Sequence, residues 1–196
     1  MSAQMITGYY GKVSSKGDFI SRGLPRSFTQ PWDRWLQECL LLLEAHLGPD
    51  WAKWFQCLGT TRFALNAGTC GPSAWIGVIL PSQDQVGRLF PLTLARRVAS
   101  DEVGSQVFRS EAEWFEATED LARQLVQGLI DPSSFSLESS REVRQLRVRR
   151  WLPAVRQRPS WWLCPMESQV VRTVGLPSTE LMMGWLESGL ASPRSK

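Results

Sequence analysis

The chain has 196 residues, of which 43% are hydrophobic and 21% are charged, and its formal net charge is +3. These values are ordinary for a globular protein, and no run reaches the roughly 18–20 consecutive apolar residues that a membrane-spanning helix needs. The first residues also lack a basic segment leading into an apolar one, so the sequence predicts a soluble, cytoplasmic protein.

The first elements in chain order are a strand and two helices. Residues 6–13 alternate loosely and predict a short opening strand, followed by an irregular passage to Pro25. Pro31 and Gly48 suit the first turn and the end of a long helix, and a second short helix is expected over residues 50–58. The long helix is predicted because large apolar residues recur at helical spacing, at Trp32, Trp35, Leu36, Cys39, Leu40, Leu43 and Leu47.

The rest of the chain predicts more strands and two further helices. The expected elements are strands at 61–67, 74–80 and 88–98, a helix at 111–130, strands at 160–166 and 169–174, and a helix at 178–187 that Ser178 caps. This order predicts one α+β domain over residues 1–190, a sandwich in which helices pack on an antiparallel or mixed sheet. Residues 191–196 are expected to form a flexible tail.

The four cysteines show no metal-binding or disulfide pattern. Cys39, Cys57, Cys70 and Cys164 contain no CxxC pair, and His46 is the one histidine of the chain. Zinc sites in proteins combine closely spaced cysteine and histidine ligands. The sequence therefore predicts buried free thiols and no metal site.

The stretch at 8–28, GYYGKVSSKGDFISRGLPRSF, has the composition of a phosphate-binding loop. A phosphate loop requires GxxxxGK followed by Ser or Thr, but Ile6 stands at the first glycine position and Val13 follows Lys12. The dinucleotide fingerprint GxGxxG is also absent from the chain. We therefore expect no nucleotide cofactor.

Catalytic patterns are weak. There is no GxSxG elbow, and His46 lies near the end of the predicted long helix. Asp18, Asp33 and Asp84 are the carboxylates considered for acid–base chemistry. A structural role also accounts for two of them, because a negative charge is favoured in a first helical turn, where Asp33 is expected, and aspartate is preferred in turns, where Asp84 is expected. The sequence therefore favours a protein that is not an enzyme.

One segment is strongly basic. Seven arginines, among them Arg147 and Arg150, lie between positions 141 and 158, and the pair Trp161–Trp162 follows. Arginine beside tryptophan suits nucleic acid, but it equally suits a protein interface or a solvated face. Most of the ten tryptophans, including Trp32, are expected in the core.

Two blocks carry a family resemblance. GKVSSKGDFISRGLPRSFTQPWDRWL in the first part of the chain and PSQDQVGRLFPLTL at 81–94 closely resemble the TagF family, also called ImpM, of type VI secretion accessory proteins. The resemblance extends over residues 6–187, although the last third matches less distinctly beyond the Trp-Trp pair at 161–162. Ser14 departs from the family, which commonly has proline there.

The resemblance implies a non-catalytic, post-translational regulator that represses type VI secretion in a Gram-negative bacterium. The implied partner is the cytoplasmic scaffold protein of that system that carries a forkhead-associated domain. The implied fold is a compact α/β sandwich similar to longin or profilin domains. No membrane-spanning segment is expected in the chain, and no nucleic acid is expected as a partner.

The residues proposed for partner binding or for the motif are Lys12, Gly17, Asp18, Arg22, Trp32, Asp33, Asp84, Arg88, Arg147 and Arg150. Our hypothesis is that the two blocks converge, with Asp18 paired to Arg88 or Arg22 paired to Asp84. Two alternatives remain open. One is an enzyme that acts on a phosphorylated or nucleotide ligand through Lys12, Asp18 and Arg88, and the other is a nucleic-acid binder that uses the arginines at 141–158.

Overall fold

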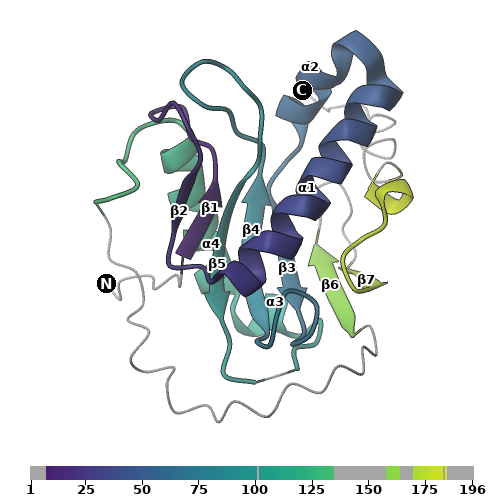
Figure 1. Ribbon diagram of the computed structural model, residues 1–196. Helices are drawn as coiled ribbons and strands as arrows, with labels where there is room; N and C mark the ends of the chain where they lie inside the picture. The colour runs from purple at the N-terminus through teal and green to yellow at the C-terminus, as the bar shows by residue number, and fades with distance from the viewer. Residues whose placement is uncertain (1–7, 101, 135–157, 164–169, 183, 185–196) are drawn as a thin grey trace, which may run out of the picture.

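The computed structural model describes residues 8–100, 102–134, 158–163, 170–182 and 184. Its strands are β1 (Gly8–Gly11), β2 (Ile20–Arg22), β3 (Thr61–Leu65), β4 (Trp75–Leu80), β5 (Leu92–Arg97), β6 (Pro159–Leu163) and β7 (Val170–Val174). Its helices are α1 (Arg26–Leu47), the short 3-10 turn η1 (Gly48–Asp50), α2 (Trp51–Cys57), α3 (Val107–Ser110) and α4 (Ala112–Val126), as Figure 1 shows.

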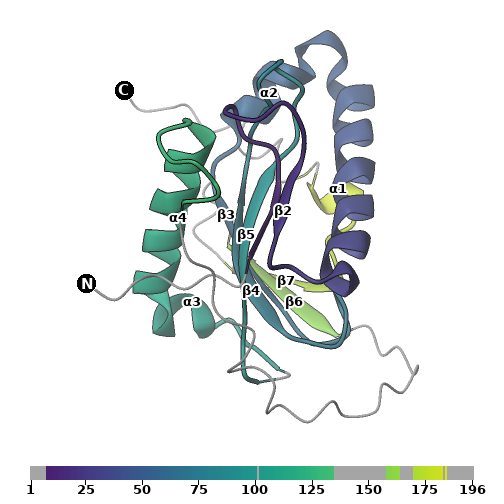
Figure 2. The ribbon, with the colours of Figure 1, turned by 60° about the vertical axis from the view of Figure 1, so that its left-hand side comes forward.

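The seven strands form one sheet in the order β2-β1-β5-β4-β3-β6-β7. Every neighbouring pair is antiparallel, so the segment that begins with β6 extends the sheet beside β3. Helix α1 covers one face and helices α3 and α4 cover the other, as Figure 2 shows from the side. The predicted α+β sandwich with an antiparallel sheet is therefore confirmed.

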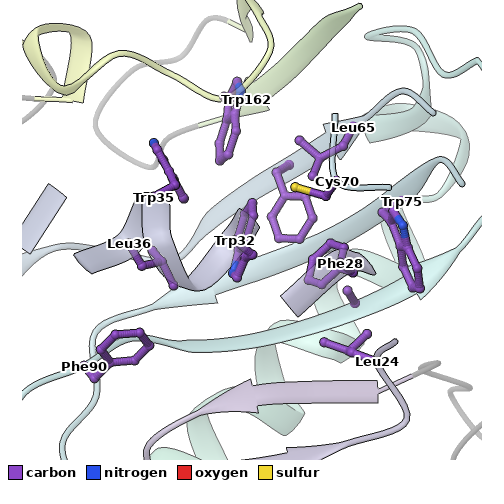
Figure 3. Packing of buried hydrophobic residues seen from close by; sticks show 12 residues of the cluster. Leu24, Phe28, Trp32, Trp35, Leu36, Leu65, Cys70, Trp75, Phe90 and Trp162 are labelled. Atoms are coloured by element: carbon purple, nitrogen blue, oxygen red, sulfur yellow. The ribbon is translucent and has the colours of Figure 1, made fainter. Parts of the chain in front are cut away.

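The face under α1 is filled by aromatic side chains, which we call the tryptophan core: Phe28, Trp32, Trp35, Phe63 and Trp162 (Figure 3). The Trp32 and Trp162 rings are stacked, with their centroids 6.1 Å apart. The three indoles of the tryptophan core have polar partners: Trp32 Nε1 donates to Thr93 Oγ1 at 2.9 Å, Trp35 Nε1 to the Pro177 carbonyl at 2.9 Å, and Trp162 Nε1 to Thr173 Oγ1 at 3.1 Å. These bonds satisfy the polar atoms that burial would otherwise leave unpaired.

The opposite face has a second, mainly aliphatic core. Ala64, Ile76, Val78, Leu92 and Leu94 point toward α3 and α4 from the sheet. The helices contribute Phe108, Phe115, Ala122 and Leu125. Alternating strand residues thus supply two separate cores, which is what a sheet covered on both faces requires.

The beginning of α1 differs from the prediction. The helix starts at Arg26 rather than near Pro31, and Pro31 lies inside it. Pro25 holds the extended conformation before the first turn, with φ −73° and ψ 155°. Phe28, which is fully buried one turn before Trp32, continues the apolar face toward the N-terminus. This burial offsets the hydrogen bond that Pro31 cannot donate.

Smaller differences concern short elements. The sequence predicted an irregular passage where β2 lies and no element where α3 lies, and its helix at 111–130 extends past the end of α4 at Val126. A three-residue strand has too few positions for alternation to be recognised. The closing helix is confirmed where it is described, because residues 179–182 and 184 are helical and the Leu181 amide donates to Ser178 Oγ.

The cysteine prediction is correct in part. Cys39, Cys57 and Cys70 are free thiols, of which Cys70 is buried, Cys39 is half-buried and Cys57 is exposed at the end of α2. Cys164 lies outside the described residues. Within the described residues, no helix is both long enough and apolar enough to cross a membrane.

Candidate functional site

Two loops at one end of the sheet hold five of the ten motif residues: Lys12, Gly17, Asp18, Asp84 and Arg88. One joins β1 to β2 over residues 12–19, and the other joins β4 to β5 over residues 81–91; both lie at the upper end in Figure 1. The Gln85 amide donates to the Lys16 carbonyl at 2.9 Å, and Ser82 Oγ donates to the Lys12 carbonyl at 2.7 Å. The convergence of the two sequence blocks is therefore an observed feature of the fold.

Asp84 is the centre of the contact between these loops. Its side chain is 0% exposed, and Oδ2 lies 3.0 Å from Lys12 Nζ and 2.6 Å from Arg88 Nε. Oδ1 accepts hydrogen bonds from the amides of Val86 at 3.1 Å and Arg88 at 2.9 Å. We call Lys12, Asp84 and Arg88 the Asp84 cluster. The four bonds occupy the full acceptor capacity of the carboxylate.

The electrostatics of the cluster favour the charged carboxylate. Burial by itself raises the pKa of Asp84, but the hydrogen bonds from the Arg88 amide, the Lys12 ammonium and the Arg88 guanidinium outweigh it. The pKa of Asp84 is therefore well below its usual range. Lys12, whose side chain is only 7% exposed, supplies the positive charge that a buried carboxylate requires.

The local sequence explains how the second loop turns. The Asp84 amide donates to the Arg88 carbonyl at 3.1 Å, and the Gly87 amide donates to the Asp84 carbonyl at 3.0 Å. Gly87 has a φ of +84°, a region that favours glycine over other residues. The aspartate side chain then caps two amides of the same turn, as the turn preference of aspartate predicts.

Phe19 covers the cluster from the solvent side. The Lys12 ammonium lies 5.0 Å from the centroid of the Phe19 ring, close enough for a cation–π contact. The same ring packs edge-on against Phe90 at 4.8 Å and stacks on Tyr10 at 5.8 Å. Phe19 is nevertheless exposed on its outer side.

A third loop, residues 127–134 after α4, completes this end of the molecule. Lys16 Nζ lies 2.7 Å from Asp131 Oδ2, and Ser14 Oγ donates to the Val126 carbonyl at 2.8 Å. The hydrogen bonds from the Lys16 ammonium and from Ser133 lower the pKa of Asp131. The first loop is thus joined to the third loop by a half-exposed ion pair and to the end of α4 by a hydrogen bond.

The three loops carry exposed apolar side chains at their tips. Val86 is 72% exposed, Leu129 is 70% exposed, and the outer side of Phe19 is accessible. We call Phe19, Val86 and Leu129 the loop surface. Loops carry binding residues more often than the elements that they connect, so these three side chains mark the candidate contact surface at this end.

The predicted ion pairs within the motif differ from the observed ones. Arg88 pairs with Asp84 rather than with Asp18, and its Nη2 also donates to the Gly17 carbonyl at 2.7 Å. Asp18 is exposed and accepts from the amide of the next residue, Phe19, at 2.7 Å. Arg22 is exposed on β2 opposite Tyr9, so Asp84 has Lys12 as its second partner instead.

Trp32 and Asp33 lie on α1, outside the two loops. Trp32 is fully buried in the tryptophan core. Asp33 lies in the middle of α1 rather than in its first turn, so a helix-start role for it was wrong. Its carboxylate accepts from the Tyr10 hydroxyl at 2.5 Å and from Gln37 Nε2 at 2.7 Å. Burial, followed by the hydrogen bond to Asp33, raises the pKa of Tyr10 above its ordinary value.

Arg147 and Arg150 lie outside the described residues, with most of the arginine-rich segment. Arg158, the last arginine of that segment, is described, and its Nη1 lies 3.2 Å from Glu102 Oε1. A binding role for the arginine-rich segment at 141–158 stays a prediction.

The described residues hold no metal-ligand cluster, and Cys39 and Cys70 are poorly placed for thiol chemistry. No group of three or more His, Cys, Asp or Glu side chains there is placed to hold a metal ion. Burial raises the pKa of Cys70 to about 12, and burial together with the neighbouring Glu38 does the same for Cys39. Both thiols are therefore protonated near neutral pH, the unreactive form.

Sequence reasoning missed several residues at this end of the molecule. Phe19 carried a usable signal, because an aromatic residue stands out in a loop of Gly, Ser, Lys and Asp. The pair Lys16–Asp131 gave no signal, since its members are 115 positions apart. Leu129 was expected inside a long helix and lies instead in the loop that follows α4.

Comparison with known proteins agrees with this geometry. A family model described as the TagF N-terminal domain, type VI secretion system-associated, matches residues 8–141. The chain is also similar to PA0076 from Pseudomonas aeruginosa PAO1, whose crystal structure was determined at 2.05 Å resolution. That similarity has a TM-score of 0.72 and 29% sequence identity, and it covers 91% of this chain and 93% of that one. No curated protein matches the chain. Since the family model covers more than half of it, including both loops of the Asp84 cluster, the chain belongs to the TagF family of type VI secretion-associated proteins.

Proposed function

We propose that this protein is a non-catalytic, post-translational repressor of type VI secretion system assembly. It acts in the cytoplasm by binding the scaffold protein that carries a forkhead-associated domain, and it holds that scaffold inactive by occlusion or sequestration. Membership of the TagF family supports the association with type VI secretion. The repression and the scaffold are the parts that experiments must test.

The saturated carboxylate of Asp84 is the observation that carries the non-catalytic part of the proposal. A general base must accept a proton from a substrate within hydrogen-bond reach. Both oxygens of Asp84 already accept two hydrogen bonds each from this chain, and the pKa of the carboxyl is depressed. The cluster is built to hold two loops together rather than to exchange protons.

The loop surface supports the binding part of the proposal. The hydrogen bond between Gln85 and Lys16, with the ion pair between Lys16 and Asp131, fixes the three loops relative to one another. A surface held in place before binding loses less conformational entropy when a partner docks. The exposed side chains of Phe19, Val86 and Leu129 then supply apolar contact area.

Co-purification from cells with an intact secretion cluster tests the proposal. The tagged chain is expected to capture the forkhead-associated scaffold, and Val86→Asp is expected to reduce the capture at least tenfold. Leu41→Asp is the matched control, because Leu41 is 66% exposed on α1 and lies outside the loop surface. Circular dichroism checks that both variants fold.

Three outcomes would contradict the proposal. If the wild-type chain captures no scaffold, the proposed partner is wrong. If Val86→Asp and Leu41→Asp reduce the capture equally, the loop surface is not the binding site. Saturable nucleotide binding or phosphate release by the purified chain, abolished by Lys12→Met, would support an enzyme instead.

A further inference from the structure

Strand β7 forms one edge of the sheet, on the side opposite β2 (Figure 1). It has five residues, Val170–Val174, whereas β2 at the other edge has three. An edge strand presents backbone amides and carbonyls on its outer side, and proteins commonly cover or block such an edge. Strand β7 lies outside the residues that the family model matches.

The register identifies which backbone groups face outward. The Gly175 amide donates to the Arg158 carbonyl, and the pairing between β6 and β7 continues with Thr173 opposite Ser160 and Val171 opposite Trp162. In an antiparallel pair, alternate residues direct their amide and carbonyl toward the neighbouring strand. The backbone amides and carbonyls of Val170, Arg172 and Val174 therefore point away from β6. No other described strand pairs with these groups.

The side chains of these three residues share one face of the sheet. Val174 is 59% exposed, Val170 is partly exposed, and Arg172 lies between them. The Arg172 guanidinium carbon is 5.7 Å from the centroid of the Trp161 ring, a cation–π contact on the neighbouring strand. The Trp161 ring holds the guanidinium of Arg172 over the sheet. Among the described residues, no carboxylate forms an ion pair with Arg172.

We propose that β7 binds an extended segment of a partner protein, which adds to the sheet as an antiparallel eighth strand. The chemistry of the edge specifies the pattern apolar–any–acidic–any–apolar for that segment. Its carboxylate lies directly opposite Arg172, its apolar residues lie opposite Val170 and Val174, and its backbone bonds the outward amides and carbonyls. The inference is independent of the loop surface and of the scaffold.

The charge of Arg172 disfavours a second copy of this chain as the occupant. Antiparallel pairing of β7 with its own copy over all five residues places Arg172 directly opposite Arg172 of that copy. Like charges directly opposite each other destabilise a strand pair, and a charge at the centre of an edge strand is a known device against self-association. An acidic residue at the same position of a different strand turns this repulsion into attraction.

The test measures peptide binding to the full chain by fluorescence anisotropy. The probe is a fluorescein-labelled peptide, Ser-Val-Thr-Glu-Thr-Val-Ser, and two copies serve as comparisons, one with Lys in place of Glu and one N-methylated at the Glu amide. We expect saturable binding of the Glu peptide, about fivefold weaker binding of the Lys peptide, and at least tenfold weaker binding of the N-methylated copy. Arg172→Glu is expected to reverse the order of the Glu and Lys peptides.

Arg22→Glu is the matched control, because Arg22 is an exposed arginine on the opposite edge strand. It is expected to leave the order of the peptides unchanged. Hydrogen exchange supplies a second readout: the amides of Val170, Arg172 and Val174 exchange quickly in the free chain and slowly with the peptide bound. The proposal fails if the Glu peptide does not saturate, if Arg172→Glu leaves the order unchanged, or if those amides are already protected in the free chain.

Discussion

The tryptophan core and the Asp84 cluster hold the molecule together in different ways. The tryptophan core gathers large rings from α1, β3 and β6, and each ring contacts at least two others. The Asp84 cluster joins two loops through one carboxylate and a few directed bonds. The stability that the tryptophan core contributes is spread over many van der Waals contacts, whereas the Asp84 cluster depends on each of its few hydrogen-bonding partners.

The difference shows why the glycines and charged residues of the two blocks lie on loops, whereas Trp32 and Trp35 of the first block lie in the core. Many apolar residues can fill a core of the right volume, so a core constrains residue type loosely. A buried carboxylate with a buried ammonium beside it tolerates few substitutions, because either partner alone is a buried, uncompensated charge. The glycine-and-charge blocks are thus explained by the need to fix the loop surface in one position.

The largest expected effect is in the tryptophan core. Trp32→Ala removes a fully buried indole and is expected to lower the free energy of unfolding by about 3–5 kcal/mol. Trp32→Phe, which keeps a ring but loses the bond to Thr93, is expected to cost clearly less. Urea denaturation monitored by circular dichroism measures both. A Trp32→Ala variant as stable as the wild type would show that the tryptophan core does not dominate stability.

The next effect comes from the centre of the Asp84 cluster. Asp84→Asn leaves the Lys12 ammonium buried beside a neutral amide, so a clear fall in Tm is expected. Arg88→Ala is expected to lower Tm less, because the Arg88 side chain is 60% exposed. Adding Lys12→Met to Asp84→Asn is expected to recover part of the lost Tm. Strictly additive effects of the two changes would contradict their coupling.

The cluster also predicts a dependence of stability on acid pH. The pKa of Asp84 is lower in the folded chain than in the unfolded chain, so its contribution is complete above the ordinary carboxyl pKa of about 4. That contribution is lost as the pH falls through and below this value. The difference in urea midpoint between wild type and Asp84→Asn should therefore narrow from pH 7 to pH 3. A difference in urea midpoint that widens as the pH falls would contradict the lowered pKa of Asp84 in the folded chain.

The smallest expected effect on stability comes from the half-exposed pair between the first and third loops. Lys16→Ala removes the ion pair with Asp131, and little change in Tm is expected since exposed pairs contribute little. Hydrogen exchange of residues 127–134 should nevertheless become faster, because a loop contact is gone. Unchanged exchange there would show that the hydrogen bond from Ser14 to Val126 is sufficient to hold the loop.

Much of the fold was predictable because it follows periodic patterns. The spacing of Trp32, Trp35 and Leu36 predicted α1 and its buried face, although the burial of Phe28 extended the helix past Pro31. The seven-residue helix α2 was predicted within one residue at each end. Strand β2 was missed because its three residues carry no period.

The candidate site was predictable only as two segments. The resemblance indicated that the blocks around Lys12 and Asp84 belong together, but the choice of partners within them depends on the register of β1 against β5 and on the turn at Gly87. Charge alone made Asp18 as good a candidate for Arg88 as Asp84. Only the fold shows that Asp84 points inward and Asp18 points outward.

Hydrogen exchange of the purified complex with the forkhead-associated scaffold tests the central claim most directly. The claim is that the Asp84 cluster fixes a loop surface which contacts a protein partner. It predicts that exchange slows at residues 14–19 and 84–88 when the scaffold binds, with the outer face of α4 unchanged. Slower exchange confined to α4, with both loops unaffected, would contradict it.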